Sequence, residues 1–219
     1  MSTKKAVVFD LDGTLLDTIG DIAVSVNHAL KAFGQKEHSE AQIKTFVGNG
    51  WKRLIELSVE GGTENPLFEK IYEESKEYYA AHSQIKTRAY DGIIMLMKAL
   101  AERKIKMGIV SNKPHDQVRF LASKYFSEYI PEDFAWGENE SCGIKRKPAP
   151  DCVNALLSAM QVTKEDAVYV GDSDVDILTA KNAGVDCISV AWGFKTEQFL
   201  KEHNAQKIIK KPEELLEQF

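Results

Sequence analysis

The sequence predicts an α/β fold: an open parallel sheet flanked by helices, into which an all-helical domain is inserted. Several short apolar runs have the length of strands and lack polar–apolar alternation, which is typical of strands buried on both faces. Segments with apolar residues at three- and four-residue spacing separate most of these runs, as in helices that cover a sheet. The stretch from residue 17 to residue 89 shows helical periodicity alone and is far too long for a simple strand–helix connection. These observations indicate a Rossmann-like core and a second domain.

The strands are expected at the apolar runs that are rich in Val, Ile or aromatic residues. The clearest are Ala6–Phe9, Met107–Val110, Ala167–Val170 and Cys187–Ala191, and Phe134–Trp136 is a weaker candidate. Helical patterns lie between these runs. Strand alternating with helix favours right-handed βαβ units and therefore a parallel sheet.

The helices are expected where apolar residues recur on one face. In the core these stripes are Ile93, Leu96, Met97 and Leu100; Val118, Leu121 and Tyr125; Val153, Leu156, Leu157 and Met160; and Ile177 and Leu178. In the insertion they are Ile22, Val26 and Leu30; Ile43, Phe46 and Val47; and Phe68, Ile71, Tyr72, Ser75 and Tyr79. We therefore predict a core of residues 1–16 and 90–219 and an inserted helical domain of residues 17–89.

Composition excludes several classes of protein. The chain of 219 residues has 28 lysines and arginines against 33 acidic residues, a net charge of −5, which argues against binding to nucleic acid. No segment has the roughly 20 apolar residues of a membrane helix, and the polar start leaves no room for a secretory signal. Cys142, Cys152 and Cys187 are odd in number and lack CxxC spacing. Reduced thiols in a cytoplasmic protein are the expected reading.

Polar side chains follow three of the predicted strands. Asp10 and Asp12 follow the first strand, Ser111 follows the second, and Asp172 follows the strand that begins at Ala167. Because open parallel sheets bind ligands at the carboxyl ends of their strands, we expect these groups to meet in one crevice. Lys147 lies on a loop just upstream and is expected beside them.

Carboxylates gathered in this way repel one another, so the cluster requires a cation. Oxygen ligands without nearby His or Cys favour Mg²⁺, whose coordination is completed by water and substrate phosphate. Lys147 and the Ser111 hydroxyl are groups that hold phosphate oxygens, and a helix that starts near Pro114 would add its positive end. The combination predicts phosphoryl transfer through an aspartyl-phosphate.

Four segments, taken in order, resemble the motifs of the haloacid dehalogenase superfamily. They are Asp10–Thr14, Ser111, Lys147 and Gly171–Asp176. The resemblance extends over the whole chain, because residues 17–89 are similar to the helical cap that this superfamily inserts between its first two motifs.

The resemblance implies a role for each matching residue. Asp10 is expected to be the nucleophile and a metal ligand. Asp12 is expected to be the general acid and base, with its backbone carbonyl as a further metal ligand. Ser111 and Lys147 would hold the phosphoryl group, and Asp172 would ligate the metal.

Further residues receive supporting roles. Asp176 is expected to orient Lys147 or a metal-bound water without ligating the ion itself. Gly13 would let the backbone pass close to the phosphate, and Thr14 would orient the Asp12 side chain. Asn112, next to Ser111, is included among the expected substrate-binding residues.

Asp12 also separates subfamilies within the resemblance. An acid two residues after the nucleophile is similar to the phosphatases and phosphomutases, whereas dehalogenases lack it and ion-pumping ATPases have Thr there. Asp17–Leu30, Phe46–Leu54 and Val190–Phe194 resemble, more finely, the phosphoglycolate phosphatases. That group implies hydrolysis of a small phosphorylated metabolite.

Lys52 and Arg53 are the candidate substrate contacts on the insertion. They follow Gly48-Asn49-Gly50, which lacks the GK[ST] ending of a P-loop and is expected to be a turn that opens a helix. A carboxylate of the substrate would suit these two cations.

The sequence therefore predicts a Mg²⁺-dependent phosphatase for small phosphomonoesters, with phosphoglycolate as the first candidate substrate. The alternatives are a phosphomutase acting on β-glucose phosphates, a pyrophosphatase and, outside enzymes, a phosphate-sensing binding protein. The last alternative predicts damage in at least one motif, and none is found. A monomer and a homodimer are both compatible with the sequence.

Overall fold

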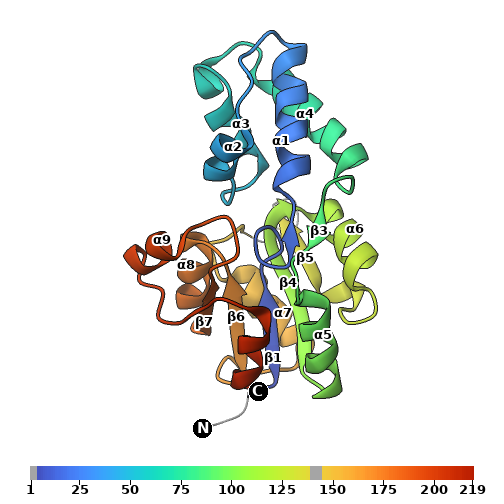
Figure 1. The fold of residues 1–219 in the computed structure, drawn as a ribbon, viewed down its shortest axis with the longest axis vertical. Coiled ribbons are helices and arrows are strands. Elements are labelled where there is room, and N and C mark those ends of the chain that lie inside the picture. The colour runs from blue at the N-terminus through green and yellow to red at the C-terminus, as the bar shows by residue number, and fades with distance from the viewer. Residues whose placement is uncertain (1–3, 139–144) are drawn as a thin grey trace. The chain divides into compact units, whose positions relative to one another are not determined.

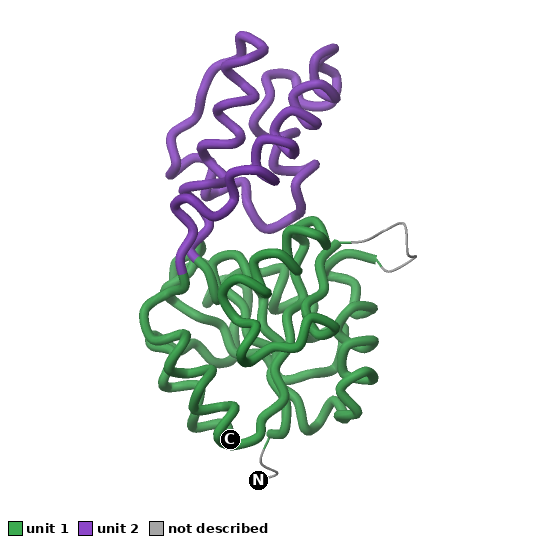
Figure 2. The backbone as a smooth tube through the Cα atoms, turned by 90° about the vertical axis from the view of Figure 1, so that its right-hand side faces the viewer, with its two compact units in different colours: residues 1–16, 89–219 green, residues 17–88 purple. Residues whose placement is uncertain are grey.

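The computed structural model describes residues 4–138 and 145–219 (Figure 1). The chain divides into two compact units, one of residues 1–16 and 89–219 and the other of residues 17–88 (Figure 2). The boundary at residue 89 differs by one residue from the predicted one.

The larger unit is built on a parallel sheet, as predicted. Among the described residues its strand order is β5-β4-β1-β6-β7-β8. The strands are β1 (Ala6–Phe9), β4 (Lys106–Pro114), β5 (Ala135–Glu138), β6 (Ala167–Gly171), β7 (Asp186–Val190) and β8 (Ile208–Ile209). Phe9 of β1 is in register with Ile109 of β4 and Val170 of β6, so β4 and β6 flank the point at which β1 ends.

Helices cover both faces of this sheet. They are α5 (Ile93–Glu102), α6 (His115–Phe126), α7 (Asp151–Met160), α8 (Asp174–Ala183), α9 (Glu197–Glu202) and the 3₁₀ helices η2 (Glu132–Phe134) and η4 (Pro212–Gln218). Val7 and Phe9 of β1 pack in one apolar cluster with α5, α6 and η4, whereas Ala6 and Val8 pack in another with α7 and α8. Because both faces of the sheet are buried, its strands read as unbroken apolar runs.

The sequence predicted that Ile177 and Leu178 form the buried face of α8, and this prediction was wrong. Leu178 is 44% exposed and Ile177 is only half-buried. The buried residues of α8 are mostly small or polar: Val175, Asp176, Thr179, Ala180 and Ala183. Helix α8 packs closely on α7 and on the sheet through these small side chains, so hydrophobicity alone pointed to the opposite face. Strand β8 and helix η4 carried no prediction.

The second unit is helical, with its own buried core. Its helices are α1 (Ile19–Ala32), α2 (Glu40–Phe46), α3 (Trp51–Ser58), η1 (Gly62–Glu64) and α4 (Phe68–His82). Helix α1 packs along α4, and a hydrogen bond of 2.9 Å from Trp51 Nε1 to Ser75 Oγ joins α3 to α4. Gly50 caps α3, as the turn at residues 48–50 predicts.

The two crossings between the units are held together. Strands β2 (Leu16–Asp17) and β3 (Arg88–Ala89) pair with each other. The buried Asp21 carboxylate accepts hydrogen bonds from the backbone nitrogens of Lys86 and Thr87 and from the Thr87 hydroxyl. Within the described ranges, no helix combines the length and apolarity needed to cross a bilayer.

Candidate active site

Asp10 lies at the end of β1, in the middle of the sheet. Its backbone nitrogen donates to the Val170 carbonyl at 2.8 Å, which ties the end of β1 to β6. Its side chain is buried, and its Oδ1 lies 2.8 Å from Lys147 Nζ. The predicted nucleophile is therefore held next to the predicted phosphate-binding lysine.

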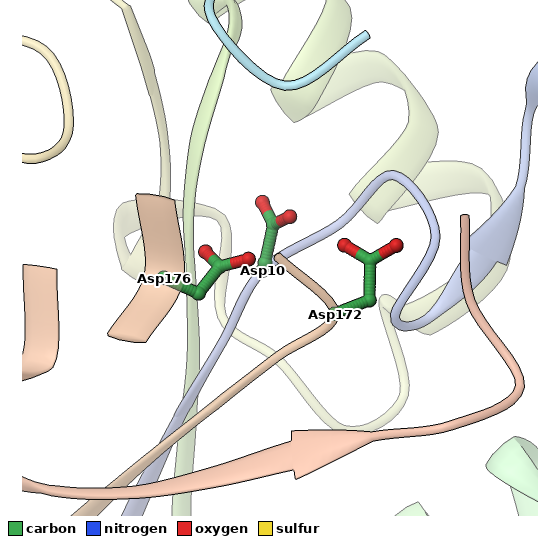
Figure 3. A group of neighbouring side chains, drawn as sticks. All are labelled: Asp10, Asp172 and Asp176. Carbon is green, nitrogen blue, oxygen red and sulfur yellow. The ribbon is translucent and has the colours of Figure 1, made fainter. Parts of the chain in front are cut away.

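Three carboxylates form one buried cluster (Figure 3). Asp10, Asp172 and Asp176 each present an oxygen, and these oxygens lie within 4.8 Å of one another. Burial raises the pKa of Asp10 to about 7, because Lys147 offsets this effect only in part and the neighbouring Asp176 adds to it. Burial, followed by the charges of Asp176 and Asp10, likewise raises the pKa of Asp172 well above its ordinary value.

Lys147 is the cation inside this cluster. Its Nζ also lies 2.8 Å from Asp176 Oδ1, so the predicted link between these residues is present. Burial by itself would lower the pKa of Lys147, but Asp10 and Asp176 outweigh burial and raise the pKa above its ordinary value. Asn112 brackets the same residue, since its amide donates to the Lys147 carbonyl and accepts from the Lys147 nitrogen.

The donor set fits a hard divalent cation. Lys147 pairs with two of the three clustered carboxyl groups, Asp10 and Asp176, so the cluster holds more acidic groups than cations, and oxygen donors of this kind suit Mg²⁺. The predicted ligands Asp10 and Asp172 belong to the cluster. Asp176, predicted only as a supporting residue, is also a member. The Asp12 carboxylate is not.

Asp176 is fixed by the first turn of α8. Its Oδ2 accepts from the nitrogen and hydroxyl of Ser173, and its Oδ1 accepts from the Tyr169 hydroxyl at 3.0 Å. A Cβ atom on Gly171 would overlap the Asp176 side chain. The helix start therefore orients the carboxylate that contacts Lys147.

The Asp12 carboxylate points to a residue that carried no prediction. Lys113 Nζ lies 2.9 and 3.0 Å from its two oxygens. The buried Ser111 hydroxyl, predicted to hold phosphate, accepts from the Lys113 nitrogen at 3.2 Å. The run Ser111-Asn112-Lys113 at the end of a predicted strand was the signal that could have revealed this lysine.

A loop after β7 closes on the same site. The Phe194 nitrogen donates to Asp172 Oδ2 at 2.6 Å, and Trp192 Nε1 donates to the Thr14 carbonyl at 3.0 Å. Two features require a glycine at position 13. A Cβ there would overlap the Asp172 carboxylate, and the φ of +83° is one that residues with a side chain rarely adopt. The buried Thr14 hydroxyl has no hydrogen-bond partner in the described part of the chain, and its role in orienting Asp12 stays a prediction.

A family model confirms what these residues resemble. Residues 7–190 match the model described as haloacid dehalogenase-like hydrolase. The chain belongs to this family. The matched range spans residues of both units and includes the carboxyl ends of β1, β4, β6 and β7.

Known relatives of this hydrolase are phosphatases. The phosphoglycolate phosphatase of Vibrio parahaemolyticus is 31% identical over 97% of this chain and 95% of its own length. That of Vibrio cholerae is 32% identical over 89% and 87%. A crystal structure from Lactobacillus delbrueckii subsp. bulgaricus, provisionally described as a phosphoglycolate phosphatase, is 36% identical with a TM-score of 0.92 over 99% of this chain and 98% of that one. These similarities show a phosphoric monoester hydrolase of the phosphoglycolate phosphatase-like kind.

Two predicted site residues of this hydrolase lie in the helical unit. Lys52 is exposed and Arg53 pairs with Glu56 at 2.8 Å, both on the first turn of α3. Contact of Lys52 or Arg53 with substrate stays a prediction.

Proposed function

We propose that this hydrolase moves the phosphoryl group of a small phosphomonoester first to Asp10 and then to water, with Mg²⁺ as cofactor. The observation that carries the proposal is the buried carboxylate cluster with Lys147 in its midst. Asp10 Oδ1 lies 2.8 Å from the lysine nitrogen, at the carboxyl end of the central strand. A carboxylate so placed can attack phosphorus while a fixed cation offsets the charge of the phosphoryl oxygens.

Each residue then has a defined task. The Asp10 oxygen forms a bond to phosphorus as the bond to the leaving oxygen breaks, and Asp12 gives its proton to that oxygen. In the second step Asp12 takes a proton from the water that attacks phosphorus, which frees Asp10 and releases inorganic phosphate. Lys147 and Ser111 hold the phosphoryl oxygens throughout, and Gly13 keeps its backbone close to them.

The proposed ion would be held by Asp10, Asp172 and the Asp12 backbone carbonyl, and Asp176 would orient Lys147 or a metal-bound water. When bound, Mg²⁺ supplies positive charge that lets a phosphate dianion enter a site lined by carboxylates. Asn112 supports this arrangement indirectly, because it holds the Lys147 backbone.

Phosphoglycolate is the substrate that we propose. Its support is the name shared by the relatives from two Vibrio species, together with the two cations at the start of α3. We infer that residues 17–89 act as a cap that selects substrates, with Lys52 and Arg53 recognising the carboxylate of phosphoglycolate. A cytoplasmic location is part of the proposal, since Cys152 and Cys187 are both free thiols.

A turnover screen over small phosphorylated metabolites tests the proposal. With Mg²⁺ present, we expect phosphoglycolate to give the highest kcat/KM, with inorganic phosphate as the product, and exhaustive chelation to abolish turnover. The screen includes β-glucose 1-phosphate and pyrophosphate, and it measures transferred as well as free phosphate. A phosphorylated sugar as the main product would indicate a mutase. A folded protein that binds phosphate but turns over no ester would overturn the enzyme proposal.

A further inference from the structure

Lys113 is a buried cation that the proposed chemistry leaves without a task. Its side chain is 2% exposed, and its Nζ lies 2.9 and 3.0 Å from the two oxygens of Asp12, whose side chain is 13% exposed. In the part of the chain that the structure describes, only Lys113 and Lys147 are lysines buried to this extent. Lys147 contacts Asp10 and Asp176, so the two lysines serve different carboxylates.

The backbone of Lys113 is held firmly. Its nitrogen donates to Ser111 Oγ at 3.2 Å. On the neighbouring strand β5, a Cβ added to Gly137 would lie 2.5 Å from the Lys113 carbonyl oxygen, so the two strands are in close contact at this point. Ser111 itself follows the apolar part of β4, which pairs with β1. The ammonium group is thus presented from a fixed strand end toward the loop that carries Asp12.

A buried ion pair of this kind contributes little to stability, because desolvation of the two charges offsets their attraction. Its effect on geometry is larger. Two contacts to one carboxylate restrict both torsions of a short side chain that lies on a turn. Proton transfer depends strongly on such placement, since an error of about 1 Å can cost about a hundredfold in rate.

We propose that Lys113 is a positioning residue for Asp12: it holds the carboxyl group in the orientation from which a proton passes to the leaving oxygen. This inference rests on the proposed function, in which Asp12 is the acid and base. Lys113 thus supports proton transfer by holding Asp12, whereas its neighbour Asn112 supports phosphate binding by holding the backbone of Lys147.

The test compares ethyl phosphate with p-nitrophenyl phosphate in Lys113→Met. An alkoxide leaving group needs a proton as the bond breaks, whereas nitrophenolate needs little. The ratio kcat/KM reports the first transfer, to Asp10, which is the step in which the two esters differ. We expect kcat/KM for ethyl phosphate to fall by about 10- to 100-fold and that for the aryl ester by less than about threefold.

Matched variants separate positioning from a general loss of structure. Lys106→Met makes the same substitution at the other end of β4 and should leave both esters within about twofold. Lys113→Arg keeps the cation and should restore most of the activity on the alkyl ester. The Mg²⁺ concentration that gives half of the Mg²⁺-induced rise in melting temperature should change by less than about twofold in Lys113→Met. If Lys113→Met does not fold, Lys113→Gln is measured in its place.

Asp12→Asn provides the decisive background. In this variant the alkyl-to-aryl ratio is already low, and adding Lys113→Met should not lower it further. If wild type hydrolyses neither ester, or if Asp12→Asn reduces both esters equally, the proposed function fails. If Asp12→Asn shows the expected ratio but Lys113→Met reduces both esters equally, or neither, Lys113 does not position Asp12.

Discussion

The Asp10 carboxyl lies in surroundings that oppose its own ionisation. Burial raises its pKa to about 7, and the charge of Asp176 adds to this effect, although Lys147 partly offsets it. A carboxylate that loses its hydration in this way is a better nucleophile and a better metal ligand, but it destabilises the metal-free protein. The residue that we propose as the nucleophile is therefore one whose ionised form folding by itself disfavours.

Asp10→Asn should abolish turnover and yet stabilise the metal-free protein at pH 8. The folded state keeps a proton on Asp10 up to a pH of about 7, whereas the unfolded state releases it near the ordinary value of 3.8. Stability is therefore lost as pH rises between these values, and the loss is complete above about 7. An amide does not ionise, so the free energy of unfolding in chelator at pH 8 should rise by about 1–3 kcal/mol.

Urea unfolding in EDTA at pH 5 and pH 8 measures this effect. Asp91→Asn, at an exposed turn, is the control and should change stability by less than about 0.5 kcal/mol. The prediction is contradicted if Asp10→Asn is less stable than wild type at pH 8, or if it retains turnover. Beryllium fluoride should bond to Asp10 in the wild-type protein and to no residue in the variant.

At the scale of elements, the loop after β7 holds two parts of the site in place. The Phe194 nitrogen holds Asp172, Trp192 holds the Thr14 carbonyl, and Gly193 passes between the two contacts. A Cβ on Gly193 would overlap the backbone carbonyl oxygen of Gly13 and the Cβ and Oδ2 atoms of Asp172. This loop therefore fixes the ends of β1 and β6 relative to each other.

Gly193→Ala should weaken the metal site without unfolding the core. The added methyl group must push the loop outward and with it the Phe194 nitrogen that orients Asp172. We expect the Mg²⁺ concentration for half-maximal activity to rise by about tenfold or more, because supporting contacts of metal ligands typically contribute 10- to 100-fold in affinity. Calorimetric or thermal-shift titration with Mg²⁺ measures the affinity directly.

Gly20→Ala is the matched control for this substitution. Gly20 lies in α1, where Ala is the better helix former, and the three atoms nearest its added Cβ would all belong to the Lys86 side chain, at 3.0–3.7 Å. Unchanged Mg²⁺ affinity in Gly193→Ala would show that the loop after β7 plays no part in holding Asp172.

At the scale of the whole molecule, the carboxylate cluster and both buried lysines belong to one unit, whereas Lys52 and Arg53 belong to the other. Each unit has its own buried core, and the paired strands β2 and β3 mark the two crossings between them. We therefore expect substitutions in the helical unit to change which ester is preferred rather than how phosphorus is attacked.

Lys52→Gln and Arg53→Gln should raise KM for phosphoglycolate more than for ethyl phosphate. Phosphoglycolate presents a carboxylate at the end opposite its phosphate, and a charge-assisted contact to it contributes about 1.5–3 kcal/mol, or roughly ten- to a hundredfold in kcat/KM. Ethyl phosphate lacks that group and should be hydrolysed at nearly the wild-type rate. Steady-state kinetics on the two esters measure the difference.

Lys70→Gln, which removes an exposed cation from α4 of the same unit, controls for the change in net charge. It should leave both esters unchanged. If Lys52→Gln with Arg53→Gln weakens both esters equally, or neither, these cations do not recognise the carboxylate, and phosphoglycolate loses its support from the residues themselves.

The sequence by itself determined the sheet and the residues expected around Asp10. Strands buried on both faces leave unbroken apolar runs, and parallel strands end at one edge of the sheet. Asp10, Ser111 and Asp172 could therefore be expected to meet before any coordinates were known. The long helical stretch likewise stood out, because its periodicity differs from that of the core.

Only the tertiary structure decided which side chains contact one another. The buried face of α8 consists of small and polar residues, so periodicity assigned Leu178 to the wrong face. Asp176 joins the carboxylate cluster because the turn at Ser173 aims it inward, and Lys113 reaches Asp12 although 100 residues separate them in sequence. Spacing along a chain specifies the face of a strand or helix, whereas distances between distant residues arise from the packing of the elements that carry them.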